Sequence, residues 1–337
     1  MSTHFGRHSL HRVESTSPEP VGWLSEYSEP ALRAVLRASA PQLADLPIAL
    51  EGTPDLSNPI WASSHATVGE RMFAKFAHSE RTAVRIWREA QTLELLGNEL
   101  GLAVPKLIAA SRNPAFSSTE LVSGAPLSYE TVTAAAPDRI AQLAAQLASF
   151  LSQLHAAHTL ARVREQLDSL PRLPEQGLHV STNELRARFT TMIEPHQRLM
   201  VSRWCDWVDN ELAAPADTVF VHGDFHPYNQ LWDLDEPRLL AVIDFENSGL
   251  AEPEFDFRGL PAFGPGVDLL VSTVKRYEAL SVRKLSLSRI MALHLLNYLG
   301  DALWRTEAGI SLPEPGDTPS AYVEEAAGRL AALGIDP

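Results

Sequence analysis

The pattern of apolar and polar residues divides the chain into a strand-rich part and a helical part. Short apolar runs separated by glycine, proline, asparagine and serine predict strands at 48–50, 60–62, 72–77, 107–110 and 119–122. Two helical patterns accompany them, an amphipathic stretch at 29–39 and apolar residues at three- and four-residue steps over 81–96. The break at Ser123, Gly124 and Pro126 predicts a hinge after which the pattern changes.

Beyond the hinge the apolar spacing is mainly that of helices. One apolar stripe covers 140–154, and the weakly periodic segment 159–181 is interpreted as an inserted connection. A long helix of about 30 residues is predicted from Thr182. Two dense apolar runs, each followed by polar residues, predict buried strands at 219–221 and 239–243. Three further helices are expected at 267–280, 287–305 and 321–333.

Length and composition extend this picture to a two-lobed α+β protein. A chain of 337 residues exceeds what one hydrophobic core usually holds. We expect a loosely ordered lead-in at 1–29, rich in serine, histidine, proline and glutamate, a first lobe at 30–122, and a hinge with a second lobe at 123–337.

The net charge of −14 argues against nucleic acid or an anionic membrane as a partner, because either needs a basic surface. No apolar run reaches the roughly 18 to 20 residues of a spanning helix, and the first residues lack a signal-peptide pattern, so we expect a cytoplasmic protein. The single cysteine, Cys205, lies in an apolar run and is expected in the core.

The segment from His222 to Asn229 carries the strongest chemical signal. Asp224 and Asn229 lie five residues apart in a loop after a predicted strand, and Asp244 ends the next strand. Phosphoryl transfer needs a group that orients the acceptor hydroxyl, oxygen ligands for Mg²⁺ and a cation on the phosphates. Mg²⁺ accepts a small number of protein oxygen ligands, so one Asn and one Asp suffice. Either carboxylate alone is typical of a turn, but their joint occurrence favours phosphoryl transfer.

This pattern resembles the aminoglycoside phosphotransferase family, whose signature is His-Gly-Asp, then His-Pro and Asn, followed by Ile-Asp-Trp/Phe-Glu. The resemblance implies a protein-kinase-like fold, with an antiparallel sheet and a helix in the first lobe and a mainly helical second lobe. It implies Asp224 as catalytic base, Asn229 and Asp244 as ligands of Mg²⁺, and Asp256 as a brace for the catalytic loop. Tyr228 stands where the family commonly has Gly, and Glu252 where it commonly has Asp.

A lysine in the first lobe is the candidate phosphate ligand. Only four of the 28 basic residues are lysine, and Lys75 lies in a predicted strand, 14 residues before Glu89 on the predicted helix. A lysine in a strand is commonly solvated. The family resemblance instead implies that Lys75 pairs with Glu89 and contacts the α- and β-phosphates of ATP or GTP.

The loop for the nucleotide phosphates has no Gly-x-Gly-x-x-Gly or Walker pattern. Ser57 and Asn58 occupy the expected place between two strands, where the resemblance implies donors to phosphate oxygens and ordinary turn formation is the alternative. The adenine is expected to meet the backbone of the hinge from Glu120 to Val122.

The remaining candidates concern loop structure and the acceptor. We interpret His155, His222 and His226 as structural residues. Acidic residues that could face a cationic acceptor, or simply form an acidic surface, are Glu246, Glu252 and Glu254. Aromatic and hydrogen-bonding residues at helical spacing that could also meet an acceptor are His294, Asn297, Tyr298, Asp301 and Trp304.

The resemblance therefore implies a kinase of small molecules, monomeric or homodimeric, and most simply one that modifies a sugar-containing antibiotic of the aminoglycoside or nucleoside type. One alternative is a metabolic kinase for choline, homoserine or a fructosamine. Another is a catalytically inactive binding protein with the same fold, against which the presence of Lys75, Asp224, Asn229 and Asp244 argues.

Overall fold

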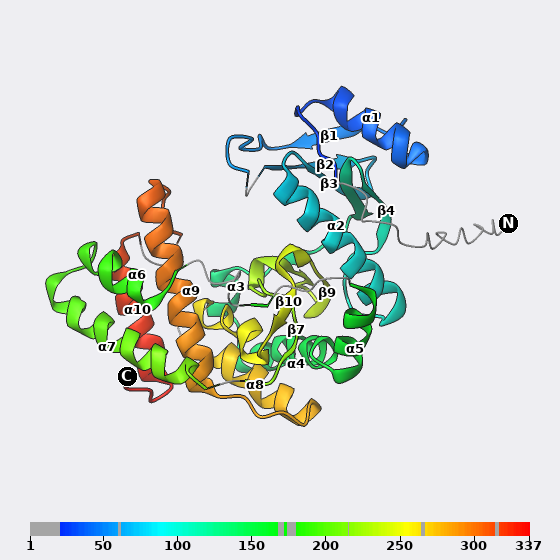
Figure 1. The fold of residues 1–337 in the computed structure, drawn as a ribbon. Helices are drawn as coiled ribbons and strands as arrows, with labels where there is room; N and C mark the ends of the chain where they lie inside the picture. Colours follow the sequence, from blue (N-terminus) through cyan, green and yellow to red (C-terminus); the bar gives the residue numbers. More distant parts are fainter. Residues whose placement is uncertain are drawn as a thin grey trace.

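A five-stranded antiparallel sheet forms the centre of the first lobe in the computed structural model (Figure 1). The structure describes residues 21–59, 62–167, 172–173, 180–214, 216–263, 267–313 and 317–337. The strand order is β1-β2-β3-β5-β4, with bounds β1 Ile48–Glu51, β2 Ser63–Val68, β3 Met72–Ala77, β4 Leu107–Arg112 and β5 Ala115–Glu120. Side chains alternate between the two faces of a strand, so Phe73 and Lys75 of β3 project to the same face.

Two helices pack on this sheet. Helix α1 (Glu29–Ser39) begins at the N-cap Ser28 and buries its apolar stripe against Phe76 and Phe116 of the sheet. Helix α2 (Glu80–Glu94) begins with a capping box in which the side chains of Ser79 and Thr82 bond each other's backbone N–H. Figure 1 shows α2 between the sheet and the second lobe. Residues of α2 can therefore reach both lobes.

The chain crosses between the lobes through a short extended segment. Strand β6 (Ala125–Pro126) pairs with β8 (Gln230–Asp233), which pairs in turn with β9 (Arg238–Val242). Gly124 permits the close approach, because a Cβ there would lie 3.1 Å from the backbone nitrogen of Trp232. The hinge is thereby attached to the hairpin that follows the candidate catalytic loop.

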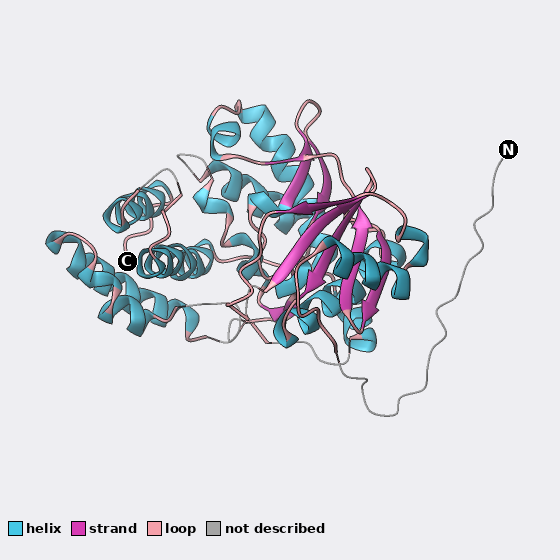
Figure 2. Cartoon of the chain, turned by 90° about the horizontal axis from the view of Figure 1, so that it is seen from above, coloured by secondary structure: helices cyan, strands magenta, loops and turns pink. Residues whose placement is uncertain are grey.

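Helices dominate the second lobe. Their bounds are α3 Tyr129–Thr133, α4 Pro137–Leu154, α5 Ala157–Gln166, α6 Thr182–Ala187, α7 Pro195–Leu212, α8 Asp268–Leu280, α9 Leu287–Ala308 and α10 Pro319–Ala332. Helices α4 and α8 pack together through a large apolar core that also includes α7, α9 and α10. In Figure 2 the helices around the C-terminus lie to one side of the strands. None of the helices in the described part of the chain is long and apolar enough to cross a membrane.

Strand pairing brings two polar loops together. Strand β7 (Val219–Val221) pairs with β10 (Gly249–Ala251), and the hairpin β8-β9 lies between them in sequence. The backbone N–H of Ile243 donates to the carbonyl of Asn229 over 2.9 Å. The loop after β7 and the loop after β9 therefore lie side by side.

The predicted fold class is confirmed, and so is the core position of Cys205, which is 2% exposed. The long helix predicted from Thr182 is wrong. Helix α6 ends at Ala187 and α7 starts only at Pro195, because proline at the first helical position favours a new helix start.

Two other element predictions were also wrong in part. The connection predicted at 159–181 begins as helix α5, and its residues 168–171 and 174–179 lie outside the described part of the chain. Of the strand predicted at 60–62, only Ala62 is described, and it is not in a strand, since β2 starts one residue later. Most of the predicted lead-in, residues 1–20, is also outside the described residues.

Candidate active site

The loop from His222 to Asn229 follows β7 and is held by backbone contacts. The backbone N–H groups of His222 and Gly223 donate to the carboxylate of Asp256 over 2.8 and 2.9 Å. Gly223 has φ +85, and a Cβ there would lie 2.1 Å from the carbonyl oxygen of Asn247. Only glycine fits this position, so the two neighbouring loops lock each other's backbone.

Asp256 is the centre of a buried brace beneath this loop. Its side chain is fully buried and also accepts a hydrogen bond from Nε2 of buried His155 over 3.1 Å. Burial by itself would raise the pKa of Asp256, but the hydrogen bond and charge of His155 and the Gly223 N–H hold it below its usual value. Buried Arg258 completes the brace by donating to the Gly223 carbonyl over 2.6 Å.

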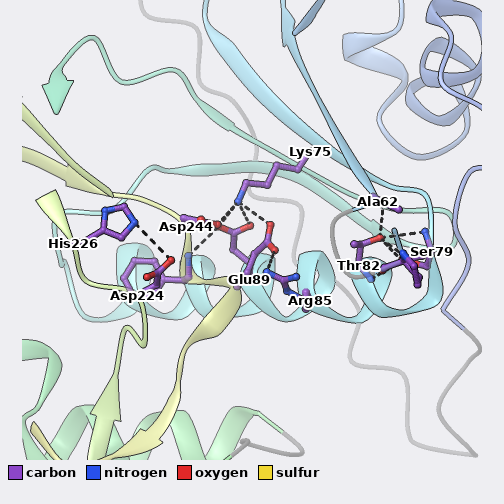
Figure 3. A network of polar contacts seen from close by, with 12 residues as sticks. Ala62, Lys75, Ser79, Thr82, Arg85, Glu89, Asp224, His226 and Asp244 are labelled. Atoms are coloured by element: carbon purple, nitrogen blue, oxygen red, sulfur yellow. Dashed lines mark hydrogen bonds and ion pairs between the residues drawn. The ribbon is translucent and has the colours of Figure 1, made fainter. Parts of the chain in front are cut away.

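Asp224 lies on this fixed loop and is accessible, with 38% of its side chain exposed. Its backbone N–H donates to Nδ1 of His222 over 3.1 Å, and its carbonyl accepts from Nδ2 of Asn229 over 3.0 Å. Figure 3 shows His226 facing the Asp224 carboxylate, with 3.7 Å between Nε2 and Oδ2. The carboxylate is thus oriented by its backbone and remains open to a further ligand.

Lys75 of β3 is the second centre of the site. Its ammonium lies 2.8 Å from Oδ1 of Asp244, 2.9 Å from Oε2 of Glu89 on α2, and 3.1 Å from Oε1 of Glu246 (Figure 3). Arg85, one turn before Glu89, pairs with the other oxygen of Glu246 at 2.8 Å. We call these five residues the Lys75 cluster.

Three carboxylates around one ammonium shift one another's protonation. Burial, with the charges of Glu246 and Asp244, raises the pKa of Glu89 to about 7 against the lowering effect of Lys75. Burial also acts to raise the pKa of Asp244, but the charge and hydrogen bond of Lys75 outweigh it and hold this pKa at about 2. The same carboxylates keep the pKa of Lys75 above its usual value despite the opposing effect of burial. Lys75 and Asp244 are therefore charged at neutral pH.

Asp244 also has an unusual backbone. It is the only non-glycine residue with positive φ in the described part of the chain, with φ 68 and ψ 59. This left-handed conformation costs a non-glycine residue about 1–3 kcal/mol. The conformation aims the carboxylate at Lys75 from a side chain that is 37% exposed.

A cleft of about 510 Å³ opens beside the Lys75 cluster, between the sheet and the second lobe. Its apolar and aromatic lining includes Phe73, Leu93, Pro105, Leu231 and Ile243. His65 of β2 stacks on Phe73 with ring centroids 5.4 Å apart. The hinge residues Glu120, Leu121 and Val122 line one side, and Asn229 and Asp244 line another. The cleft combines apolar walls with a charged end, as small-molecule and cofactor sites commonly do.

Residues 52–280, more than half of the chain, match the model of the phosphotransferase enzyme family. The chain belongs to this family. The match includes both polar loops, Lys75 and Glu89, and it confirms the expected resemblance and the expected enzyme class at the level of the family.

Solved structures agree with the fold of this phosphotransferase. It is similar to the GDP complex of an aminoglycoside 2'-phosphotransferase, with a TM-score of 0.65 and 15% identity, covering 89% of this chain and 96% of that chain. It is also similar to a macrolide 2'-phosphotransferase type I, with a TM-score of 0.57 and 21% identity, covering 88% of this chain and 94% of that chain. The protein-kinase-like fold is thereby confirmed.

Curated relatives match over shorter segments. An uncharacterized protein, YcbJ, of Bacillus subtilis is 26% identical over 116 residues, which are 33% of this chain and 35% of that protein. The phosphotransferase therefore spans only about a third of the length of this curated relative.

The residues expected at a phosphate loop lie apart from the cleft. The backbone N–H and hydroxyl of Ser57 donate to Oδ1 of Asp55 over 3.0 and 2.6 Å, which is the arrangement of an exposed turn. Neither Ser57 nor Asn58 is among the residues that line the cleft. Of the two readings offered by the sequence, this geometry favours the turn.

Two of the acidic residues considered for the acceptor are committed to protein partners. Glu252 forms an ion pair with Arg289, and only 9% of its side chain is exposed. Glu254 is buried, accepts from the backbone N–H of Ser286, and has a pKa raised by that burial. The third, Glu246, belongs to the Lys75 cluster. Burial and pairing leave Glu252 and Glu254 poorly placed to attract a cation.

The candidates on α9 are mostly internal as well. Tyr298 is 8% exposed and stacks on Tyr322 with centroids 4.4 Å apart. Asn297 accepts from Arg258 over 3.4 Å, and Asp301 pairs with Arg305 at 2.8 Å. His294 is buried as well, and burial, followed by the charge of Arg329, lowers its pKa to about 3. Trp304 is exposed, at 42%, and the Asp301 side chain is 38% exposed beside its ion pair.

Sequence reasoning missed several residues that complete the site. His65 escaped because the strand was predicted at 60–62, whereas the register of β2 and β3 places His65 opposite Lys75. Arg85 could have been found four residues before Glu89, on the same helix face. Arg258 was missed because two of its partners, Asn297 and Gly223, lie 39 and 35 residues away in sequence.

The residues present fit a divalent cation. Oxygen atoms of Glu89, Asp244 and Glu246 lie within 4.8 Å of one another, and hard cations prefer such ligands. The Asn229 amide nitrogen is committed to the Asp224 carbonyl, so its oxygen is the atom directed elsewhere. Asn229 and Asp244 line the same cleft, and they are the candidate ligands.

Proposed function

We propose that this protein transfers the γ-phosphate of ATP or GTP to a hydroxyl of a small molecule, with Asp224 as the catalytic base. The observation that carries the proposal is the position of Asp224 and Asn229 on one braced loop. Asn229 lines the cleft that contains Lys75 and Asp244, while the accessible carboxylate of Asp224 is not among the lining residues. We infer that the loop directs Asn229 toward the phosphates and leaves Asp224 to meet the acceptor.

The nucleotide base occupies the apolar end of the cleft in this proposal. Phe73 and His65 offer a ring face, and the hinge from Glu120 to Val122 offers backbone groups. Lys75, at the charged end, contacts the phosphates. Nucleotide use is supported by the similar phosphotransferase structures, which contain GDP or ADP.

Asn229 and Asp244 would hold Mg²⁺, which when bound neutralises charge on the phosphates. In this structure the Lys75 ammonium pairs with the Asp244 carboxylate at 2.8 Å. We infer that the ammonium turns from Asp244 toward the phosphates when nucleotide is present, while Glu89 keeps it in the cleft. The excess of carboxylates in the cluster makes this exchange of cations electrostatically feasible.

Asp224 orients the acceptor hydroxyl and takes its proton. The acceptor oxygen forms a bond to the γ-phosphorus as the bond from that phosphorus to the leaving diphosphate oxygen breaks, and the hydroxyl proton moves to the Asp224 carboxylate. The buried brace at Asp256 fixes the loop before any ligand binds. The base is therefore positioned without reorganisation during the reaction.

For the acceptor we propose a sugar-containing antibiotic, which would give the protein a cytoplasmic role in resistance. Similar folds act on such compounds, since the neighbours include aminoglycoside and macrolide phosphotransferases. A screen with antibiotics, choline, homoserine and a fructosamine, scored by release of nucleoside diphosphate, distinguishes this class from metabolic kinases. Transfer to choline or homoserine alone would contradict the antibiotic class.

The variant Asp224→Asn tests the base. We expect turnover to fall on the order of 100-fold or more with an unchanged melting temperature, because the amide orients but cannot accept the proton. Asp206→Asn is the matched control, since Asp206 is an exposed aspartate on α7. Turnover near that of the control would refute the assignment of Asp224, and absence of acceptor-dependent release in the wild type would refute the enzyme function.

A further inference from the structure

An exposed aromatic ring lies within the catalytic loop itself. Tyr228 sits between Asp224 and Asn229 in sequence and is 55% exposed. The position is one where phosphotransferases of this family commonly have glycine, so the loop does not require a ring for its shape. The ring therefore calls for an explanation other than loop structure.

The neighbours Tyr228 and Asn229 differ in where they lie. Asn229 is 8% exposed and lines the nucleotide cleft, whereas Tyr228 does not line it. Asp224, the proposed base, is likewise accessible without lining the cleft. Neither the exposed ring nor the base is therefore committed to the nucleotide cleft, and His226 contacts both of them.

The Tyr228 ring has two aromatic neighbours, one of which also contacts the proposed base. The Tyr228 ring meets Phe263 edge-on, with centroids 5.4 Å apart, and His226 with centroids 6.0 Å apart. His226 in turn lies 3.7 Å from the Asp224 carboxylate. A flat ligand resting on Tyr228 is therefore adjacent to the group that takes the proton.

The position of this ring is fixed by its surroundings. The backbone N–H of Tyr228 donates to Nδ1 of His226 over 3.2 Å, and Phe263 behind the ring is 8% exposed. Gly259 allows the loop to pack closely, since a Cβ there would lie 2.9 Å from the Phe225 carbonyl oxygen. A fixed ring loses little conformational entropy when a ligand stacks on it.

The acidic residues that could recruit a polycation are already engaged. Among the described residues considered for this role, Glu246 is paired with Lys75 and Arg85, and Glu252 with Arg289. Glu254 is buried, and Asp301 is paired with Arg305. This distribution favours recognition by a ring surface over recognition by charge.

We propose that Tyr228 is a specificity-determining residue on which a ring of the acceptor stacks. The acceptor is then a molecule of low charge whose target hydroxyl lies on, or next to, a ring with an apolar face. This inference rests on the proposed function, because it names the acceptor class of the same site. Stacking of this kind corresponds to about a tenfold change in affinity.

Binding is measured without turnover in the Asp224→Asn background. Three ring-bearing probes of low charge, a macrolide, a nucleoside and a neutral phenyl glycoside, are compared with kanamycin by saturation-transfer NMR in the presence of ADP and Mg²⁺. We expect binding of at least one ring-bearing probe to weaken about tenfold on adding Tyr228→Gly and to persist in Tyr228→Phe, which keeps the ring. Trp23→Ala, which removes a ring that is 47% exposed in the segment before the first lobe, is the matched control and should change nothing.

Kinetics on the otherwise wild-type protein separate recognition from chemistry. For a transferred ring-bearing acceptor, Tyr228→Gly should raise KM about tenfold while changing kcat and the KM for nucleotide by less than about twofold. A purely structural role would instead lower kcat and the melting temperature together. The proposal would be overturned if every ring-bearing probe bound the Tyr228→Gly variant as tightly as it binds the Asp224→Asn protein that keeps Tyr228. It would also be overturned if none of these probes bound at all. Preferred, salt-sensitive binding of kanamycin that does not depend on Tyr228 would overturn it too.

The two failures are distinguishable. Tyr228-dependent binding without any release of nucleoside diphosphate would refute the phosphotransfer function and leave the stacking surface standing. Acceptor-dependent release that is unchanged by Tyr228→Gly would uphold the enzyme function and refute the role of Tyr228.

Discussion

The carboxylates around the proposed catalytic loop form two groups, Asp256 alone and the three carboxylates of the Lys75 cluster, and the groups differ in how completely they are satisfied. In the first group, Asp256 receives three donors, from His155 and from the backbone of His222 and Gly223. In the second group, three carboxylates converge on the single ammonium of Lys75, with Arg85 as a second cation on Glu246. The first group is complete, whereas the second holds one more carboxylate than cations.

This difference distinguishes a group that only supports the loop from a group that can bind a ligand. A buried group with all its hydrogen bonds made stabilises one geometry and gains nothing from a ligand. The Lys75 cluster has surplus negative charge, and the pKa of its Glu89 carboxyl is raised to about 7. An added cation therefore stabilises this cluster. Residue types alone do not distinguish the two groups, but the balance of donors and acceptors does.

Removing the brace should have the largest effect. Asp256→Ala leaves buried N–H groups of the loop and buried His155 without their acceptor, which should lower the free energy of unfolding by about 3–5 kcal/mol. Urea unfolding measures this loss, with exposed Asp217→Ala as the control. A loss below about 1 kcal/mol would show that the loop does not depend on the brace.

Lys75→Met should have its main effect on catalysis. Loss of the ammonium removes the proposed phosphate contact, so turnover should fall on the order of 100-fold. Lys106→Met is the control, because Lys106 is an exposed lysine of the same lobe. Unchanged turnover and an unchanged KM for nucleotide would mean that Lys75 serves the fold alone.

Glu89→Gln should give a milder form of the same defect, about tenfold in turnover, since the lysine remains. The double variant with Lys75→Met should be no worse than Lys75→Met alone if the two residues act as a unit. Fully additive losses in the double-mutant cycle would contradict the functional pairing seen at 2.9 Å.

The stability of the folded protein should also depend on pH. The folded-state pKa of Glu89, about 7, exceeds its ordinary value of 4.5, so the folded protein binds this proton more tightly than the unfolded chain. Glu89 should therefore lower stability progressively as pH rises from about 4.5 to about 7. Denaturant midpoints of the nucleotide-free wild type should fall relative to Glu89→Gln across this window, whereas exposed Glu120→Gln should follow the wild type. Parallel curves for wild type and Glu89→Gln would contradict this assignment.

The sequence predicted the parts of this site that depend on neighbouring residues. The loop from His222 to Asn229 is one segment, and Lys75 and Glu89 are joined by a single turn, so local spacing brings each set together. The contact of Lys75 with Asp244 spans 169 residues and depends on how the lobes meet, which no periodicity records. The brace escaped in part for the same reason, since Arg258 reaches the Gly223 carbonyl across 35 residues of sequence.

The helices and strands could likewise be predicted only where the signal lies in neighbouring residues. Apolar periodicity located most helices, because a helix that packs on a core must keep one apolar face. It failed after Thr182, where the apolar spacing continues through a break at Pro195. At that point the proline and the capping box formed with Glu194 decide the structure, and they outweigh the periodic signal.

The left-handed backbone of Asp244 has an evolutionary consequence. At φ 68 a glycine would relieve backbone strain of about 1–3 kcal/mol, but it would also remove the ion pair with Lys75. The aspartate therefore has a local backbone cost that its carboxylate must offset. In a descendant that has lost Lys75 nothing offsets this cost, so Asp244 should then be replaced, which makes this position a marker of whether the Lys75 cluster of a relative is still intact.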